Sequence, residues 1–425
     1  MNASRGSLTV AAFGITVAVW FVGYVGRLPA VMLPSWAVGS LMLAVLVIGG
    51  ALWGRHQARP LRDGALAGGG VGLLNLLILG SLLGGSRPGE VIPSAAIWVP
   101  GSILVSALLV AIGAALGAKL APAARPFTNW VGAMYWVAVS VTMLLLGVGG
   151  LVTSAEAGLA VVDWPKSFGY NMFLYPLSKM TGGIYYEHAH RLIGFLVGMT
   201  TLFAAITTQR LESRGWVRRL AWIAVAAVVV QATLGGLRVT ERSLPLAMAH
   251  GILAQLFFST LVALATFTST RWRGDETPTL RPGVRGERLL GAVLVGSIAV
   301  QLVLGAAQRH FQALLLLHIL SGLAIVAPLA LHVGFKSWAL NDHSKLLKRM
   351  GLALVALVGF QVLLGFGAYL ATRGAAAGTM PMAADLWLAT LHQWTGAVLL
   401  ATAVSLHCWS HRLLGPLTLD PQTAP

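Results

Sequence analysis

The sequence predicts an all-α integral membrane protein with about twelve transmembrane helices. Of its 425 residues, 57% are hydrophobic and only 10% are charged, and the mean hydropathy is +0.79. A soluble domain carries about 25% charged residues, so this composition is that of a polytopic membrane protein. The apolar residues also fall into separate segments, each about as long as a membrane-spanning helix.

Twelve apolar segments follow one another along the chain, and each is long enough to cross a hydrocarbon core of about 30 Å as a helix. The second and third segments are rich in glycine. The expected spans are 8–25, 36–53, 65–84, 94–118, 129–153, 184–208, 217–238, 246–270, 288–308, 313–335, 349–371 and 386–411.

Basic residues predict the orientation of these spans. If the N-terminus is cytoplasmic, 20 of the 29 Lys and Arg residues lie in cytoplasmic segments, which also places the C-terminus there. We therefore expect a multi-pass protein of a bacterial-type plasma membrane, with the lipid bilayer as its surroundings. The net charge of +16 then reflects the membrane topology. The sequence has no basic stripe interleaved with aromatic residues, so we expect no nucleic-acid partner. The single cysteine, Cys408, excludes an intramolecular disulfide and a thiolate metal cluster.

Two connections differ from the short hairpins between the other spans. Leu120–Asn129 contains two prolines and separates the first four spans, residues 1–120, from the rest. Thr153–Gly183 is the longest outer loop and is rich in aromatic residues. A loop of this length exceeds what a hairpin needs, so we expect it to fold over the membrane face as a lid.

The remaining eight spans contain an internal repeat. Gln231-Ala-Thr-Leu-Gly235 ends the seventh span, and Gln361-Val-Leu-Leu-Gly365 has a similar place in the eleventh. Leucine-rich runs that end in Gly147 and Gly305 close the fifth and ninth spans in the same way. Each run is followed by an outer loop and a helix that opens with a histidine. This pattern predicts two pseudo-symmetric four-helix bundles in tandem.

The two expected bundles comprise residues 129–270 and 288–411. Four histidines occupy equivalent places near the start of their even-numbered spans, namely His190, His250, His318 and His392. Small residues beside each histidine leave room for a flat macrocycle, and facing histidines could supply both axial ligands of a b-type haem iron. We expect one site per bundle, His190/His250 and His318/His392, both near the outer face.

A second arrangement of haems is also compatible with the second bundle. His318 and His332, and likewise His392 and His407, are separated by 14 or 15 residues, which in a helix is about 21 Å. Two such helices could stack two haems through the membrane, as in a quinol-linked cytochrome. The first bundle has no histidines at that spacing, so His332 and His407 are interpreted as polar residues near the cytoplasmic headgroups.

Glu187 distinguishes the two bundles. It precedes His190 by three residues and shares its helix face, whereas Leu315 stands at the matching place before His318. A haem held only for electron transfer needs no acid there, but a haem that is itself chemically altered could use one as a proton relay. Arg191 lies on the outer side, where haem propionates would point.

At these residues the chain resembles the haem A synthases of the cytochrome oxidase assembly pathway. The resemblance covers about residues 129–411. It is carried by Leu146-Gly-Val-Gly-Gly-Leu-Val-Thr153, Ala157-Gly-Leu159, Asp163-Trp-Pro165, Glu187-x-x-His190-Arg191, Gln231…Gly235-Gly236, His250, His318 and His392-Gln393. The family's fold is eight transmembrane helices in two four-helix bundles, and its activity is oxidation of a methyl group of haem O to the formyl group of haem A.

The resemblance implies a role for each site residue. His190 and His250 would flank the substrate haem, with Glu187 as the catalytic acid, and His318 and His392 would ligate the iron of a permanent haem b. The formyl oxygen comes from water in that family. Candidate partners are the farnesyltransferase that makes haem O and an electron-transfer protein, and a homo-oligomer is left open. The alternative function is a di-haem b-type electron-transfer cytochrome.

This chain departs from the family pattern in three respects. The outer loop lacks the cysteine pair of one subgroup, and the second-bundle loop Ala306–Gln312 is much shorter than its counterpart. Residues 1–120 add four spans that have no counterpart in an eight-helix protein.

Overall fold

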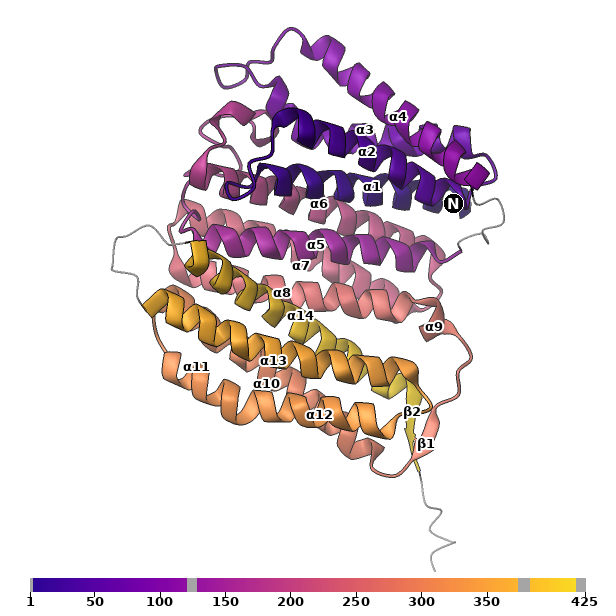
Figure 1. Cartoon of the computed structure of the whole chain (residues 1–425), viewed down its shortest axis with the longest axis vertical. Helices are drawn as coiled ribbons and strands as arrows, with labels where there is room; N and C mark the ends of the chain where they lie inside the picture. Colours follow the sequence, from indigo (N-terminus) through magenta and orange to yellow (C-terminus); the bar gives the residue numbers. More distant parts are fainter. Residues whose placement is uncertain (1–2, 121–127, 374–382, 418–425) are drawn as a thin grey trace, which may run out of the picture. The chain divides into compact units, whose positions relative to one another are not determined.

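The computed structural model describes residues 3–120, 128–373 and 383–417 and is built almost entirely of helices (Figure 1). Most of the proline-containing connection at Leu120–Asn129 lies outside the described residues. The long helices are α1 (Ala3–Arg27), α2 (Ser35–Gly54), α3 (Pro60–Leu83), α4 (Ala95–Leu120), α5 (Trp130–Ser154), α6 (Gly182–Leu211), α7 (Gly215–Thr240), α8 (Leu244–Thr268), α10 (Val284–Phe311), α12 (Ala327–Leu340), α13 (Lys345–Arg373) and α14 (Ala383–Leu413).

Short elements complete the described chain. They are the 3-10 turns η1 (Met172–Leu174) and η2 (Leu177–Lys179), the helices α9 (Thr270–Arg273) and α11 (Leu315–Ser321), the π-helical segment η3 (Gly322–Val326) and the strands β1 (Thr279–Arg281) and β2 (Leu414–Pro416). β1 and β2 pair in parallel, with Leu280 opposite Gly415. The segments α11, η3 and α12 run on without a break, so they form one membrane-length span.

The predicted all-α membrane fold is confirmed. Among the described residues, eleven helical segments are long and apolar enough to cross a membrane, and each matches an expected span. The twelfth, α14, is not among them, although with 31 residues it is the longest helix described. Its N-terminal half carries Asp385, His392 and Gln393, which lower its hydropathy.

One predicted connection is corrected. Ala306–Gln312 was expected as an outer loop, but α10 continues to Phe311, and only Gln312–Leu314 connects it to α11. Gln312 and Leu314 both have positive φ, 52° and 67°, which reverses the chain within three residues. His310 therefore lies in the last turn of α10 rather than in a loop.

The described chain divides into two compact units. Unit 1 comprises residues 1–152, 156–232 and 239–241, and unit 2 comprises residues 153–155, 233–238 and 242–425. The boundary therefore falls within α7, and the expected bundles at 129–270 and 288–411 stay a prediction.

In unit 1 the first four helices pack together through their glycines. A Cβ atom added at Gly50 would overlap the backbone of Val110, and one at Gly68 would overlap the backbone of Ser106. Such close approach of α2 and α3 to α4 needs residues without a side chain, as in other membrane helix pairs. This packing explains why the second and third spans are rich in glycine.

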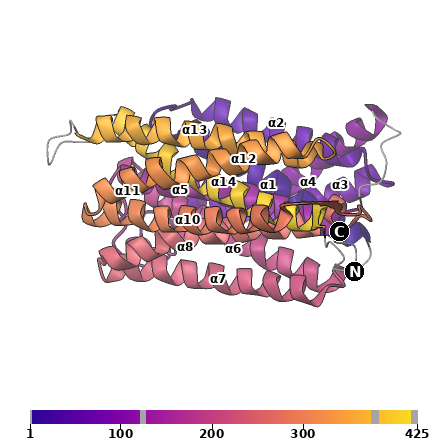
Figure 2. The ribbon, with the colours of Figure 1, turned by 90° about the horizontal axis from the view of Figure 1, so that it is seen from below.

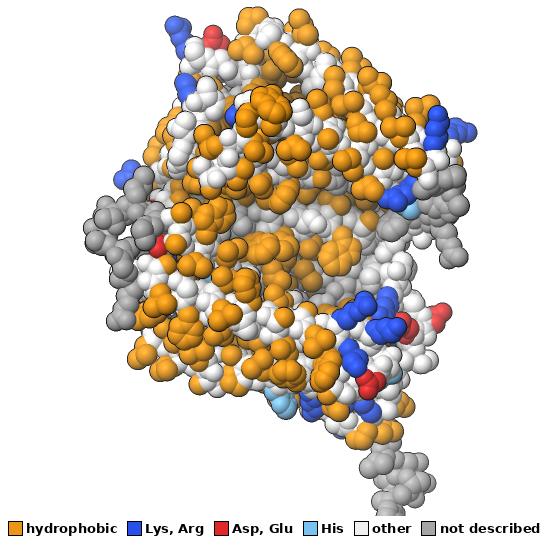
Figure 3. All heavy atoms as spheres, in the orientation of Figure 1, with side chains coloured by type: hydrophobic (Ala, Val, Ile, Leu, Met, Phe, Trp, Pro, Cys, Tyr) orange, Lys and Arg blue, Asp and Glu red, His pale blue; other side chains and the backbone are white. Residues whose placement is uncertain are grey.

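In unit 2 the helices α10, α12, α13 and α14 run side by side (Figures 1 and 2). Their core includes the fully buried Leu294, Leu354 and Leu400. Figure 3 shows apolar side chains over most of the visible surface of this unit, with Lys and Arg gathered at the end that carries β1 and β2. An apolar belt with basic residues at one end is typical of a membrane protein.

Candidate functional site

Each of the four predicted histidines lies against a glycine of the preceding long helix. A Cβ added at Gly149 would be 3.1 Å from Cε1 of His190, and one at Gly235 would be 2.8 Å from that of His250. A Cβ added at Gly305 would be 3.0 Å from Cε1 of His318, and one at Gly365 would be 2.9 Å from Cε1 of His392. Any larger residue would push the ring away, so the four glycines set how closely each imidazole approaches the neighbouring helix.

The glycines face the same part of each ring. In all four cases Cε1 is the nearest ring atom and Nδ1 the next. The Nδ1 edge is therefore turned toward the neighbouring helix. All four histidines are half-buried rather than sealed in the core.

The structure brings His318 and His392 together within unit 2. Their ring centroids are 6.2 Å apart, and the two ring planes are perpendicular. The predicted partners His190 and His250 belong to unit 1 and unit 2 respectively, so their pairing stays a prediction.

Two glutamines that sequence reasoning did not select as site residues hold His318 and His392. The Gln301 side-chain amide lies 3.0 Å from Nδ1 of His318 and 2.6 Å from its backbone oxygen. Nδ1 of His392 lies 3.2 Å from the backbone oxygen of Gln361, and the Gln361 side chain donates to the His392 backbone oxygen at 3.0 Å. Contacts at Nδ1 fix the orientation of an imidazole and, when Nδ1 donates, leave Nε2 as the ligand atom.

A hydroxyl group on each histidine helix completes these contacts. Ser321 donates to Oε1 of Gln301 at 2.8 Å, and Thr395 donates to Oε1 of Gln361. The signal in the sequence is a glutamine four residues before the glycine, together with Ser or Thr three residues after the histidine. The leucine run before Gly305 does not by itself mark Gln301 as a site residue.

The helix that carries His318 changes its winding one turn after that residue, at Gly322. The five residues of η3 are π-helical, and N–H of Gly322 bonds to the carbonyls of His318 and Ile319. Single π-helical turns are rare and often occur at functional sites. Here the irregular turn lies beside the half-buried histidine and its Gln301–Ser321 contacts.

On α6, the Glu187 carboxylate is buried and paired with Arg191. Glu187 Oε1 accepts from Nε of Arg191 at 3.2 Å, and the two side chains are only 3% and 8% exposed. The other guanidinium nitrogens of Arg191 bond to three carbonyl oxygens of the α5–α6 loop: those of Val161 at 2.9 Å, Asp163 at 2.6 Å and Lys166 at 3.0 Å. Arg191 thus joins the carboxylate to the loop.

His188 faces the loop, on a different side of α6 from His190. It is fully buried; its Nδ1 lies 3.1 Å from Oγ of Ser167, and its ring centroid lies 5.0 Å from that of Tyr175. Burial raises the pKa of Tyr175. The loop itself turns at Asp163, whose carboxylate accepts from N–H of Phe168 and Gly169 at 2.6 and 2.8 Å.

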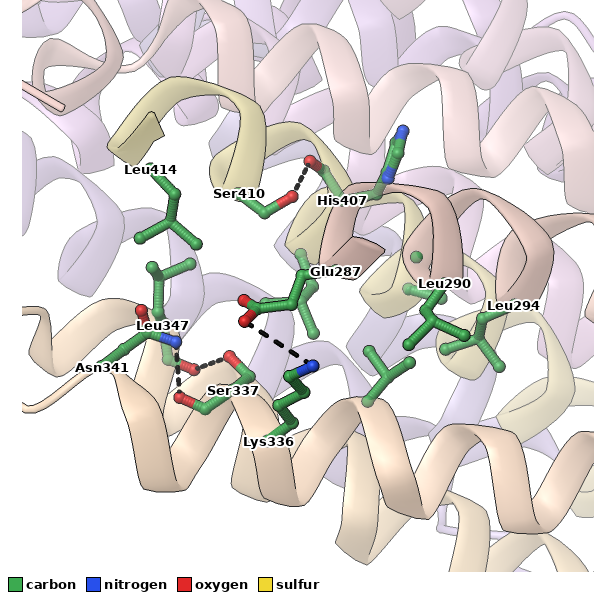
Figure 4. Close-up of a pocket in the computed structure, with 14 residues that line it drawn as sticks. Glu287, Leu290, Leu294, Lys336, Ser337, Asn341, Leu347, His407, Ser410 and Leu414 are labelled. Atoms are coloured by element: carbon green, nitrogen blue, oxygen red, sulfur yellow. Dashed lines mark hydrogen bonds and ion pairs between the residues drawn. The ribbon is translucent and has the colours of Figure 1, made fainter. Parts of the chain in front are cut away.

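A pocket at the far end of unit 2 contains His407, one histidine of the stacked-haem alternative (Figure 4). Its polar groups are largely engaged with one another. Glu287 bonds to Arg281 at 2.6 and 2.5 Å and lies 3.9 Å from Nζ of Lys336. Asn341 donates to the Ser337 carbonyl. His332, the other histidine of that alternative, does not line this pocket.

His407 is presented differently from the four predicted histidines. It also faces a glycine, Gly291, but the nearest ring atom to an added Cβ would be Nδ1 at 2.9 Å, not Cε1. Its ring lies 4.7 Å from that of His411, near the basic end of the unit. The four predicted histidines turn Cε1 toward a glycine, and His407 does not share this geometry.

The chain is similar to two known proteins, and no protein-family model matches it. It is 25% identical over 350 residues to a "Heme A synthase" of Sphingopyxis alaskensis, covering 68% of this chain and 93% of that protein. It is 29% identical over 160 residues to a "Protoheme IX farnesyltransferase" of Haloarcula marismortui, covering 37% of this chain and 32% of that protein. Both similarities are distant, and the first extends over most of the chain.

Proposed function

We propose that this chain is a membrane oxidoreductase that converts a methyl group of haem O into the formyl group of haem A. The observation that carries the proposal is the pair His318 and His392, held 6.2 Å apart. The distant similarity to a protein named "Heme A synthase", over 93% of that protein, supports the same reaction class.

The residues around His318 and His392 fit a haem b. Two imidazoles that bind one iron have ring centroids about 6 Å apart, because each metal–nitrogen bond is about 2 Å long. The observed 6.2 Å meets this requirement. The Gln361 carbonyl at Nδ1 of His392, and the glycines adjacent to both rings, are supports that ligating histidines usually have.

The proposed substrate site is on the first half of the repeat. His190 and His250 would hold the iron of haem O, each turned by its glycine, Gly149 or Gly235. Glu187 lies one turn from His190 on α6 and is the one carboxylate at such a place in the repeat. Its burial beside Arg191 keeps it in a fixed position, which a group that exchanges protons with a reacting methyl carbon requires.

The roles of the residues follow from what the conversion requires. Turning a methyl into a formyl group removes four electrons and four protons and adds one oxygen atom, here taken from water. A haem b at His318 and His392 would supply one-electron transfer out of the substrate site. Glu187 would take up protons next to the substrate, while Arg191 holds the carboxylate and the loop above it.

The experiment that tests this proposal compares the wild type with Glu187→Ala in cells that supply haem O. Haems are extracted from the purified protein and separated by chromatography with mass detection. Haem A or a hydroxylated haem O should appear with the wild type, and unmodified haem O should accumulate with the variant. Equal amounts of modified haem from both proteins would remove Glu187 from the mechanism.

A further inference from the structure

Among the N-terminal helices, α3 and the segment that follows it are in direct contact with the α5–α6 loop, within unit 1. The closest approach is made by α3. A Cβ added at Gly80 would overlap the carbonyl oxygen of Phe173, and one at Gly84 would overlap that of Leu174. Both carbonyls belong to the turn η1 in the loop. Only glycine allows α3 and this turn to come so close.

Polar contacts hold the loop against the segment that follows α3. The Ser86 carbonyl accepts from the Tyr170 hydroxyl at 2.6 Å and from Nζ of Lys179 at 3.2 Å. Lys179 also donates to the Tyr170 hydroxyl at 2.7 Å. Ser86 is itself fixed by Glu90, whose carboxylate accepts from Arg87 N–H and from the Ser86 hydroxyl. These hydrogen bonds hold the pKa of Glu90 below its usual value.

A second contact joins α1 to the first turn of α6. The Tyr185 hydroxyl donates to the backbone oxygen of Tyr24 at 2.8 Å, and the two rings are stacked with centroids 5.5 Å apart. Tyr185 is buried and lies two residues before Glu187. The N-terminal helices thus contact both the loop and the helix that carries the candidate catalytic group.

The opposite side of the loop rests on α6. Arg191 bonds to three loop carbonyls, Ser167 contacts His188, and the ring of Phe173 lies 4.9 Å from that of Phe195. Phe173 contributes to both sides, because its carbonyl faces Gly80 and its ring faces Phe195. The loop is therefore held between α3 and α6.

We propose that the N-terminal helices position the α5–α6 loop against Arg191 and Glu187 of α6, with Gly80 and Gly84 as positioning residues. This inference rests on the proposed function for its consequence in catalysis. The contacts with α3 press the loop onto α6, and Arg191 transmits the loop's position to Glu187 through its ion pair. A chain with a displaced loop would keep its haem b but lose the fixed carboxylate and the cover that excludes bulk water.

The test is amide hydrogen exchange of the full-length protein, measured by mass spectrometry. Gly84→Ala adds the methyl group that α3 cannot accommodate against Leu174. Gly69→Ala is the control, because it lies in α3, the helix that Gly84 caps, and its Cβ would meet nothing within 4 Å. Tyr170→Phe is a second variant that only removes the hydroxyl contacts to Ser86 and Lys179. Product formation and haem b content are measured on the same samples.

The inference predicts exchange about tenfold faster in residues 163–179 and 184–192 of Gly84→Ala, a smaller increase in Tyr170→Phe and no change in Gly69→Ala. The amount of modified haem should decrease in the variants whose exchange is faster, and the haem b content should stay unchanged. Unchanged exchange in the first two variants would overturn the inference, as would faster exchange with undiminished product. If Gly84→Ala does not fold, the exchange and product formation of Tyr170→Phe, compared with the wild type, test the inference. A wild type that makes no modified haem would refute the proposed function, while the exchange in 184–192 still tests the positioning by α3.

Discussion

Replacing Gly365 by alanine should weaken the haem b site specifically. The added Cβ would lie 2.9 Å from Cε1 of His392, about 0.5 Å inside the distance at which ordinary contact begins. The ring can retreat only by moving relative to the Gln361 contacts that hold its backbone and Nδ1. Overpacking of this kind costs about 1–3 kcal/mol, which corresponds to a loss of affinity of roughly 5- to 150-fold.

The assay is the haem b content of protein purified in detergent, followed by titration of the depleted protein with haem b. Gly359→Ala is the matched control, because it lies in α13 as well and its Cβ would meet nothing within 4 Å. Gly365→Ala should bind haem b more weakly and show an altered spectrum, while Gly359→Ala should match the wild type. Identical affinity and spectrum in both variants would refute the assignment of His392 as a ligand held against Gly365.

Three further predictions concern side chains of the two sites. His318→Ala or His392→Ala should lose the tightly bound haem b, whereas His407→Ala should keep it; loss of haem in the last variant, measured by pyridine haemochrome, would favour stacked haems. Glu187→Gln should retain all haem but form no modified haem, and loss of haem instead would make the carboxylate structural. Arg191→Gln leaves the buried Glu187 carboxylate without this partner, so the free energy of unfolding measured with denaturant should fall by about 3–5 kcal/mol. A decrease below about 1 kcal/mol would show that the ion pair does not anchor the loop.

The sequence was sufficient for the fold because membrane spans are encoded by length and composition alone. Each of the eleven apolar spans has a helix at the expected place, and α14 occupies the twelfth. The end of α10 was misplaced: the expected span ended at residue 308, whereas the helix continues to Phe311 and the reversal is made by the positive φ of Gln312 and Leu314. Backbone conformations of this kind have no clear sequence signal outside glycine and asparagine.

The site was only partly predictable. Repetition along the chain identified His318 and His392, and the structure brings them together. The contacts that orient them come from Gln301 for His318 and from Gln361 for His392, which are ordinary polar residues until their helices are packed. The link from Arg191 to loop carbonyls was also hidden, because backbone acceptors carry no sequence information.

The role of the N-terminal helices could not be read from composition. Residues 1–120 contain no ligand set, and their glycines are what membrane helices generally use for packing. Only the fold shows that Gly80 and Gly84 face a backbone 90 or more residues away in the chain. Long-range glycine contacts of this kind are set by tertiary structure rather than by any local pattern.

The haem composition of the wild-type protein, purified from cells that supply haem O, distinguishes a haem-modifying enzyme from an electron carrier. Pyridine haemochrome spectra give the amount of each haem type, and mass spectrometry of the extracted haems identifies any oxidised methyl group. We expect haem b together with haem A or a hydroxylated haem O. Two haems b per chain, with no modified haem, would contradict this expectation and identify the protein as a di-haem electron carrier.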